Sequence, residues 1–167
     1  MKRTLKRNMG YQKGDTILDI GCGTGIFSTL FRQYEGFDAT KTFIKAAKKK
    51  YPKKIFTLGD ARELPYKENS FDHVLLLSFI HFLKNEETKN LLNKSGKIAR
   101  KRVLIIEPVL YGNAFSKFFF GQNRGHNIKK ISQLREEISQ ELNITKIIPF
   151  TSLLYPLVLF VCEPKQE

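Results

Sequence analysis

ILDIGCGTGIFS, at residues 17–28, is the stretch of this chain that decides its fold. An apolar run leads into Asp19, and three glycines then alternate at Gly21, Gly23 and Gly25. A strand that enters a glycine-rich turn ahead of a helix brings backbone N–H groups close to a ligand, because no Cβ stands in the way. The carboxylate before the turn disfavours a phosphate and favours a ligand that carries a cationic group.

Strand-like and helix-like patterns alternate outward from this turn. We expect strands at 16–20, 35–38, 54–58, 71–78 and 102–107, then a closely spaced pair at 143–150 and 154–162. Helices are expected at 25–34, at 41–51 with Thr40 as N-cap, at 86–100 and at 132–142. The pattern predicts an α/β fold with a Rossmann-like, seven-stranded, mostly parallel sheet, helices on both faces and a C-terminal antiparallel strand pair. Residues 1–167 are expected to form a single domain.

The chain is strongly basic. Its formal net charge is +13, from 29 Lys and Arg against 16 Asp and Glu. This excess favours anionic partners such as nucleic acid, acidic lipids or acidic proteins, and a Lys-rich surface from genome bias is an equally good explanation. The basic residues are spread along the sequence, which by itself indicates no focused patch.

The cysteine content and the hydropathy indicate the cellular environment of this chain. Cys22 and Cys162 are far apart and form no metal-ligand spacing, so we expect no disulfide framework, no metal site and a reducing cytoplasm. The N-terminal residues lack the apolar core of a signal peptide. The longest apolar run, 153–162, is too short to span a membrane and contains Pro156, so no integral membrane segment is expected, while peripheral association stays open.

Three acids fall at or just after predicted strand ends, namely Asp19, Asp38 and Asp60. Ligands of open α/β sheets bind outside the carboxyl ends of the strands, so we expect these side chains at one site. The dinucleotide fingerprint G-x-G-x-x-G would need glycine where this chain has Ile26, which argues against NAD.

Three segments carry a family resemblance: LDIGCGTG at 18–25, GFDATKTFIKAAKKKYP at 36–52 and GDARELPYKENSFDHVLLLSFIHFL at 59–83. Together and in this order, they resemble class I S-adenosylmethionine-dependent methyltransferases, most closely the small-molecule group that includes the ubiquinone and menaquinone biosynthesis methyltransferases. The resemblance implies a methyltransferase with S-adenosylmethionine as its cofactor.

The resemblance also implies roles for the glycine turn. Gly21, Gly23 and Gly25 would bring backbone against the methionine and ribose of the cofactor, and Cys22 would serve as a small residue in the same turn. Asp19 would favour the cationic amino-acid end, directly or through water. The alternative for Asp19 is that it only caps the turn.

Further cofactor contacts follow from the second and third segments. Asp38 would accept hydrogen bonds from both ribose hydroxyls, and Ala39 would lie beside the adenine. Asp60 would accept from the adenine amino group, and the Ala61 N–H would donate to a ring nitrogen. Asp60 could instead be an ordinary turn residue.

The end of the fourth strand is expected beside the reactive methyl group, with Leu77 and Ser78 closest to it. His81 follows and is the candidate catalytic general base, because it aligns with a histidine common in this group; local hydrogen bonding is its structural alternative. His126 is a weaker candidate for the base, and His73 is expected to be structural. Tyr11 could close over the cofactor from the N-terminal side.

Two features bear on the methyl acceptor. Only a short segment precedes the first strand, so the N-terminal cap over the site is reduced. The remaining lid would be 109–127, where Phe115, Phe118 and Phe119 have helical spacing and could cover an apolar substrate or pack on the core. An open site would suit a large or membrane-resident substrate, or completion by a second subunit.

The favoured function is methyl transfer to a small or lipid-like molecule. An RNA (tRNA or rRNA) methyltransferase is an alternative motivated by the charge, although the chain has LSFI at 77–80 where base-amino methyltransferases have Asn/Asp-Pro-Pro-Tyr/Phe. A non-catalytic cofactor-binding partner subunit is the third possibility, and oligomerisation stays open.

Overall fold

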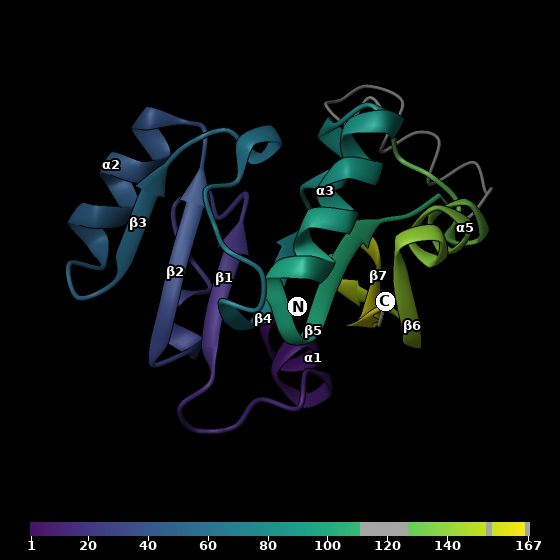
Figure 1. Ribbon diagram of the computed structural model, residues 1–167, viewed down its shortest axis with the longest axis horizontal. Coiled ribbons are helices and arrows are strands. Elements are labelled where there is room, and N and C mark those ends of the chain that lie inside the picture. Colours follow the sequence, from purple (N-terminus) through teal and green to yellow (C-terminus); the bar gives the residue numbers. More distant parts are fainter. Residues whose placement is uncertain (111–126, 153–154, 166–167) are drawn as a thin grey trace.

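A computed structural model describes residues 1–110, 127–152 and 155–165. Its strands form one seven-stranded sheet in the order β3-β2-β1-β4-β5-β7-β6 (Figure 1). The strands are β1 (Thr16–Ile20), β2 (Gln33–Asp38), β3 (Ile55–Leu58), β4 (Phe71–Leu77), β5 (Ala99–Pro108), β6 (Leu142–Ser152) and β7 (Tyr155–Pro164). The first five are parallel, and β7 pairs antiparallel with both β5 and β6. The predicted fold class is confirmed.

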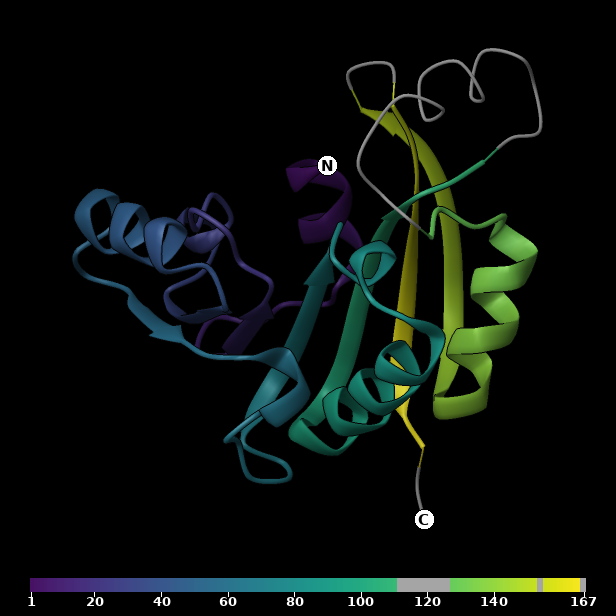
Figure 2. The same cartoon turned by 90° about the horizontal axis from the view of Figure 1, so that it is seen from above.

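The helices cover both faces of this sheet (Figure 2). They are α1 (Lys2–Asn8), α2 (Lys41–Lys50), α3 (Asn85–Ile98) and α5 (Ile131–Glu141), with the short 3₁₀ helices η1 (Ser28–Leu30), η2 (Ala61–Glu63) and η3 (Ile80–Phe82). Leu5 of α1 and Ile44 of α2 pack with one core cluster, and Leu92 of α3 and Leu134 of α5 pack with the other. Successive strand residues therefore alternate between two apolar cores.

The prediction of a helix at 25–34 is wrong. Residues 25–27 form turns, η1 is a single 3₁₀ turn, and β2 begins at Gln33. The three loop glycines all have positive φ, between 55° and 74°, so the chain after β1 cannot start a helix until past Gly25. Phe27 and Phe31 of this segment are buried in the same core cluster as Leu5 of α1 and Ile44 of α2. Conversely, α1 is a helix that the sequence reading did not predict.

The other elements lie close to their predicted positions. Thr40 holds the N-cap position of α2, but its side chain makes no capping hydrogen bond. Within the described ranges, the structure contains no helix long and apolar enough to cross a membrane.

Candidate functional site

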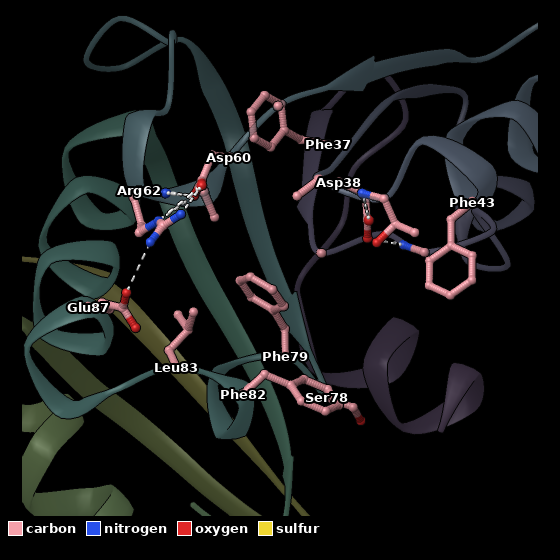
Figure 3. A pocket seen from close by; sticks show the side chains of 16 residues that line it. Phe37, Asp38, Phe43, Asp60, Arg62, Ser78, Phe79, Phe82, Leu83 and Glu87 are labelled. Carbon is pink, nitrogen blue, oxygen red and sulfur yellow. Dashed lines mark hydrogen bonds and ion pairs between the residues drawn. The ribbon is translucent and has the colours of Figure 1, made fainter. Parts of the chain in front are cut away.

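A cavity of about 560 Å³ opens at the carboxyl ends of β1, β2, β3 and β4 (Figure 3). Seven of the residues that line it were predicted from the sequence: Gly21, Gly23, Asp38, Ala39, Asp60, Ala61 and Ser78. Nine others complete the lining: Phe37, Thr40, Phe43, Gly59, Arg62, Phe79, Phe82, Leu83 and Glu87. The parallel sheet brings segments 60 residues apart in sequence to one edge, as expected for an open α/β fold.

The glycine turn forms the floor of this cavity. The Gly21 and Cys22 N–H groups donate to the Phe37 carbonyl at 2.8 and 3.2 Å, which folds the turn over the end of β2. A Cβ on Gly21 would stand 2.5 Å from the Phe79 ring, whereas a Cβ on Gly23 would meet no atom of the described residues within 4 Å. Gly23 therefore faces open space at the cavity, where a side chain would take room from a ligand. This cradle fits a ligand that packs against bare backbone.

Asp38 stands at the end of β2 with its carboxylate at the cavity. Oδ2 accepts from the Gly23 N–H at 2.9 Å, and Oδ1 accepts from the Thr40 N–H at 2.8 Å. These two bonds hold both oxygens in place while leaving each with a further lone pair. The arrangement suits acceptance of two hydroxyl donors from a ribose.

Asp60 follows β3, and its carboxylate is held by Arg62. Asp60 accepts from the Arg62 backbone N–H at 2.9 Å and from its guanidinium at 2.5–3.0 Å. Hydrogen bonds from Arg62 lower the pKa of Asp60 to about 2. The guanidinium also lies 3.5 Å from Glu87 of α3, so it bridges two walls of the cavity. The sequence alone did not indicate Arg62 as a site residue, although Arg62 lies inside the GDARELP segment at 59–65.

Asp19 lies beneath the glycine turn and not in the cavity lining. Its side chain is buried, and Oδ2 accepts from the Tyr34 hydroxyl at 2.6 Å. Oδ1 has no hydrogen-bond partner among the described residues. Burial raises the pKa of this carboxyl to about 7. An unsatisfied buried carboxylate oxygen next to the turn fits a ligand with a cationic or hydrogen-bonding group that approaches from the cavity.

Three further predicted residues also lie outside the lining. Gly25 is buried against Phe56 and Ala47, and Leu77 packs in the core. Cys22 is buried, and burial raises the pKa of its thiol far above the usual range, so it is no nucleophile. In contrast, Ser78 reaches the cavity because its φ is 55°, which turns the chain sharply after β4.

His81 does not line the cavity and is paired with a buried acid. Its Nδ1 lies 2.5 Å from Glu107 Oε2, and Glu107 Oε1 accepts from the Phe79 and Ile80 N–H groups at 2.7 and 2.9 Å. Glu107 is only 1% exposed. Because it contacts Phe79, Ile80 and His81, this single carboxylate of β5 holds the turn after β4 in place. The sequence reading missed this role, because Glu107 marked only the end of a strand.

Of the two remaining histidines, the structure describes His73 and does not describe His126. His73 is buried and lies 2.9 Å from Asp15 Oδ2, near the strand end opposite the cavity, which agrees with a structural role. His126 and the phenylalanines Phe115, Phe118 and Phe119 lie outside the described residues. Tyr11 packs against Phe31 and accepts from the Arg32 N–H, away from the cavity lining.

Comparisons with known proteins identify the family of this chain. A family model described as "Methyltransferase domain" matches residues 18–105. A demethylmenaquinone methyltransferase of Oceanobacillus iheyensis is 32% identical over 71% of this chain and 56% of its own length. A malonyl-[acyl-carrier protein] O-methyltransferase of Hamiltonella defensa is 26% identical over 90% of this chain and 57% of its own. The chain thus spans little more than half the length of these curated relatives.

Solved structures share the fold at low sequence identity. A chain from the complex of the Haloferax volcanii Trm112 methyltransferase activator with a methyltransferase has a TM-score of 0.84 at 15% identity, covering 99% of this chain and 88% of that chain. Magnesium protoporphyrin IX methyltransferase of Synechocystis PCC 6803, solved with bound SAH, has a TM-score of 0.77 at 18% identity, covering 97% and 80%. The family model and the relatives show that the chain belongs to the class I S-adenosylmethionine-dependent methyltransferases, as its sequence predicted.

Proposed function

We propose that this chain is an active methyltransferase that transfers the methyl group of S-adenosylmethionine to a small or lipid-like molecule. The observation that carries the proposal is the division of the cavity into two chemically different parts. Asp38, Asp60 and the Gly23 backbone form a hydrogen-bonding part at β2 and β3, and Phe79, Phe82 and Leu83 form an apolar part after β4. The first part suits the cofactor, and the second suits an apolar acceptor.

Each polar group has a definite task in this proposal. When bound, S-adenosylmethionine would supply an electrophilic methyl group on its sulfonium sulfur. Asp38 would hold the ribose, Asp60 and the Ala61 N–H would bind the adenine edge, and Asp19 below the turn would balance the ammonium group. Phe79, whose ring lies against Gly21, excludes water from the apolar part.

His81 is the proposed general base; it does not itself line the cavity, but it lies in the turn between the lining residues Phe79 and Phe82. Nδ1 faces Glu107, which leaves Nε2 as the ring nitrogen that can accept a proton from the acceptor. Glu107 stabilises the imidazolium that forms when His81 accepts this proton.

The names of two relatives, a demethylmenaquinone methyltransferase and a malonyl-[acyl-carrier protein] O-methyltransferase, support a small or lipid-like acceptor. An RNA methyltransferase is the second candidate, favoured by the net charge of +13. A non-catalytic role beside a partner subunit is the third, and turnover by the isolated chain would exclude it.

Free thiols at Cys22 and Cys162 agree with action in the cytoplasm.

Calorimetric titration with S-adenosylhomocysteine tests the proposal. We expect micromolar binding by the natural chain and at least a tenfold loss in Asp38→Ala, because two ribose hydroxyls lose their acceptor. Glu68→Ala, an exposed substitution away from the cavity, serves as the matched control and should bind normally. Absence of binding by the natural chain would refute the cofactor assignment.

A further inference from the structure

The positive charge of this protein is gathered over one face of its sheet. Residues 1–15, 21–32 and 39–54 form the segments before β1, between β1 and β2, and between β2 and β3. They contain thirteen of the 29 Lys and Arg residues and a single acid, the buried Asp15, which forms an ion pair with Lys101. The rest of the chain contains sixteen basic and fifteen acidic residues, so its formal charge is only +1. A uniform genome bias would raise the Lys content of every surface and does not explain this separation.

The same three segments pack on the same face. Leu5 of α1, Phe27 and Phe31 of the intervening segment, and Ile44 and Ala47 of α2 belong to one core cluster. Figure 2 shows α1 and α2 on one side of the sheet and α3 and α5 on the other. We define the basic face by the exposed residues of these two helices: Lys2, Arg3, Lys6 and Arg7 of α1, and Lys41, Lys45, Lys48, Lys49 and Lys50 of α2.

The opposite face has a different character. Helix α3 contains Glu86 and Glu87 beside its lysines, and α5 contains three glutamates and a single arginine. Positive and negative side chains are mixed there, as on an ordinary solvated surface. The basic face is therefore a property of α1 and α2 and not of helices in general.

Two large apolar side chains are exposed among these charges. Ile26 is 42% exposed and Phe43 is 46% exposed. Ile26 lies between the two helices, because its neighbour Gly25 packs near Ala47 of α2 and its neighbour Phe27 lies beneath the Lys2 ammonium group of α1. Phe43 is also part of the cavity lining, so the basic face reaches the mouth of the cofactor cavity.

We propose that the basic face docks on an anionic membrane surface. Lysines at a bilayer surface attract acidic headgroups, and exposed Ile and Phe side chains enter the boundary between headgroups and acyl chains. Nucleic acid is the less fitting partner, because Ile26 offers no stacking surface and α2 contains only Lys, which cannot bind phosphate in the bidentate way of Arg. Docking in this orientation places the mouth of the cavity next to the bilayer.

Flotation of the full chain with lipid vesicles tests this surface. We expect binding to vesicles of phosphatidylcholine with one third phosphatidylglycerol, little binding to pure phosphatidylcholine, and weakening as salt rises from about 0.05 to about 0.5 M. Lys45→Glu/Lys48→Glu/Lys49→Glu should lower the partition coefficient at least about tenfold, since each basic residue at an anionic surface contributes severalfold. Lys45→Gln/Lys48→Gln/Lys49→Gln should lower the partition coefficient less. This variant keeps the proposal testable if the triple Glu variant does not fold.

A matched control exchanges three exposed basic residues outside the basic face, as Lys89→Glu/Arg135→Glu/Lys146→Glu. This control should bind nearly as the natural chain does, and an equal loss in both triples would overturn the proposal. Ile26→Ser keeps every charge and should weaken vesicle binding severalfold while leaving binding to a structured RNA unchanged. Equal binding of Ile26→Ser to vesicles, or binding to RNA but not to vesicles, would also overturn it. Flotation needs no cofactor, so failure of the methyltransferase proposal would leave this result unaffected.

Discussion

The glycines of the turn after β1 differ in what a side chain would meet. At Gly23 an added Cβ has open space within 4 Å, and at Gly25 it would stand 2.5 Å from the Phe56 ring. Gly23→Ala should therefore cost only about 1–2 kcal/mol of stability from its positive φ, yet lower S-adenosylhomocysteine affinity at least tenfold. Gly25→Ala should cost about 1–3 kcal/mol more, because the core must also make room. Denaturant unfolding and calorimetry on both variants measure the difference.

Each of the two glycine variants serves as the experimental control for the other. A Gly23→Ala protein that binds as tightly as the natural chain would contradict the assignment of the turn as the cofactor floor. If Gly25→Ala were the less destabilising of the two, the packing of Gly25 against Phe56 would carry no energetic weight.

Asp19 makes stability depend on pH in a particular direction. Burial raises its folded pKa to about 7, whereas the unfolded value is about 3.9. Between these values the native state binds more protons than the unfolded state, so this group lowers the free energy of unfolding as pH rises from about 4 to about 7. Above pH 7 its effect is constant.

Asp19→Asn removes that pH dependence and keeps a similar shape. The unfolding free energy of Asp19→Asn relative to the natural chain should rise over the same pH window by at most about 4 kcal/mol. Urea unfolding at several pH values between 4 and 8 measures it, and other titrating groups cancel because both proteins contain them. Parallel pH profiles for the two proteins would show that Asp19 is ionised throughout.

At the scale of elements, the turn after β4 depends on a residue of β5. Glu107 is buried and accepts from the Phe79 and Ile80 N–H groups and contacts His81. Glu107→Ala leaves two N–H donors, one buried and one partly buried, without an acceptor and should lower the free energy of unfolding by about 2–4 kcal/mol. Glu107→Gln keeps one carbonyl oxygen for these donors and should cost less. Amide hydrogen exchange at Phe79 and Ile80 should accelerate in the Ala variant before the rest of β4 does.

The outcome for Gln decides between two accounts of Glu107. An equal loss in both variants would mean that the negative charge, and not acceptance of the two N–H groups, holds the turn. Exchange rates at Phe79 and Ile80 that stay natural in Glu107→Ala would contradict the structural role altogether.

At the scale of the whole molecule, the concentration of charge on one face implies self-repulsion. Salt shortens the screening length from about 20 Å at 0.02 M to about 6 Å at 0.3 M, so added NaCl should raise the midpoint of thermal unfolding by several degrees. Lys45→Gln/Lys48→Gln/Lys49→Gln should reduce this rise, and Lys89→Gln/Arg135→Gln/Lys146→Gln should reduce it less. A salt response that is the same in all three proteins would show that repulsion within the basic face is energetically unimportant.

The elements predicted best were those whose signal is local. Short stretches of sequence show the hydrophobic periodicity, the acids at strand ends and Pro52 after α2. Accordingly, the structure places β1, α2, β4 and α5 within one or two residues of their expected bounds. The helix at 25–34 failed because its apolar residues are buried by a turn and not by a helical face. The need for glycine at position 25 also depends on the Phe56 ring, which is 31 residues away and leaves no room for a Cβ.

The sequence by itself determined the α/β order of this protein, its family, and the placement of Asp38 and Asp60 at neighbouring strand ends. These features follow from short-range patterns and from the geometry that parallel strands impose on their carboxyl ends. Only the tertiary structure decided that Arg62 holds Asp60, that Glu107 supports the turn before His81, and that α1 and α2 bring dispersed basic residues onto one face. Such relations join residues far apart in the chain, and packing rather than local propensity selects them.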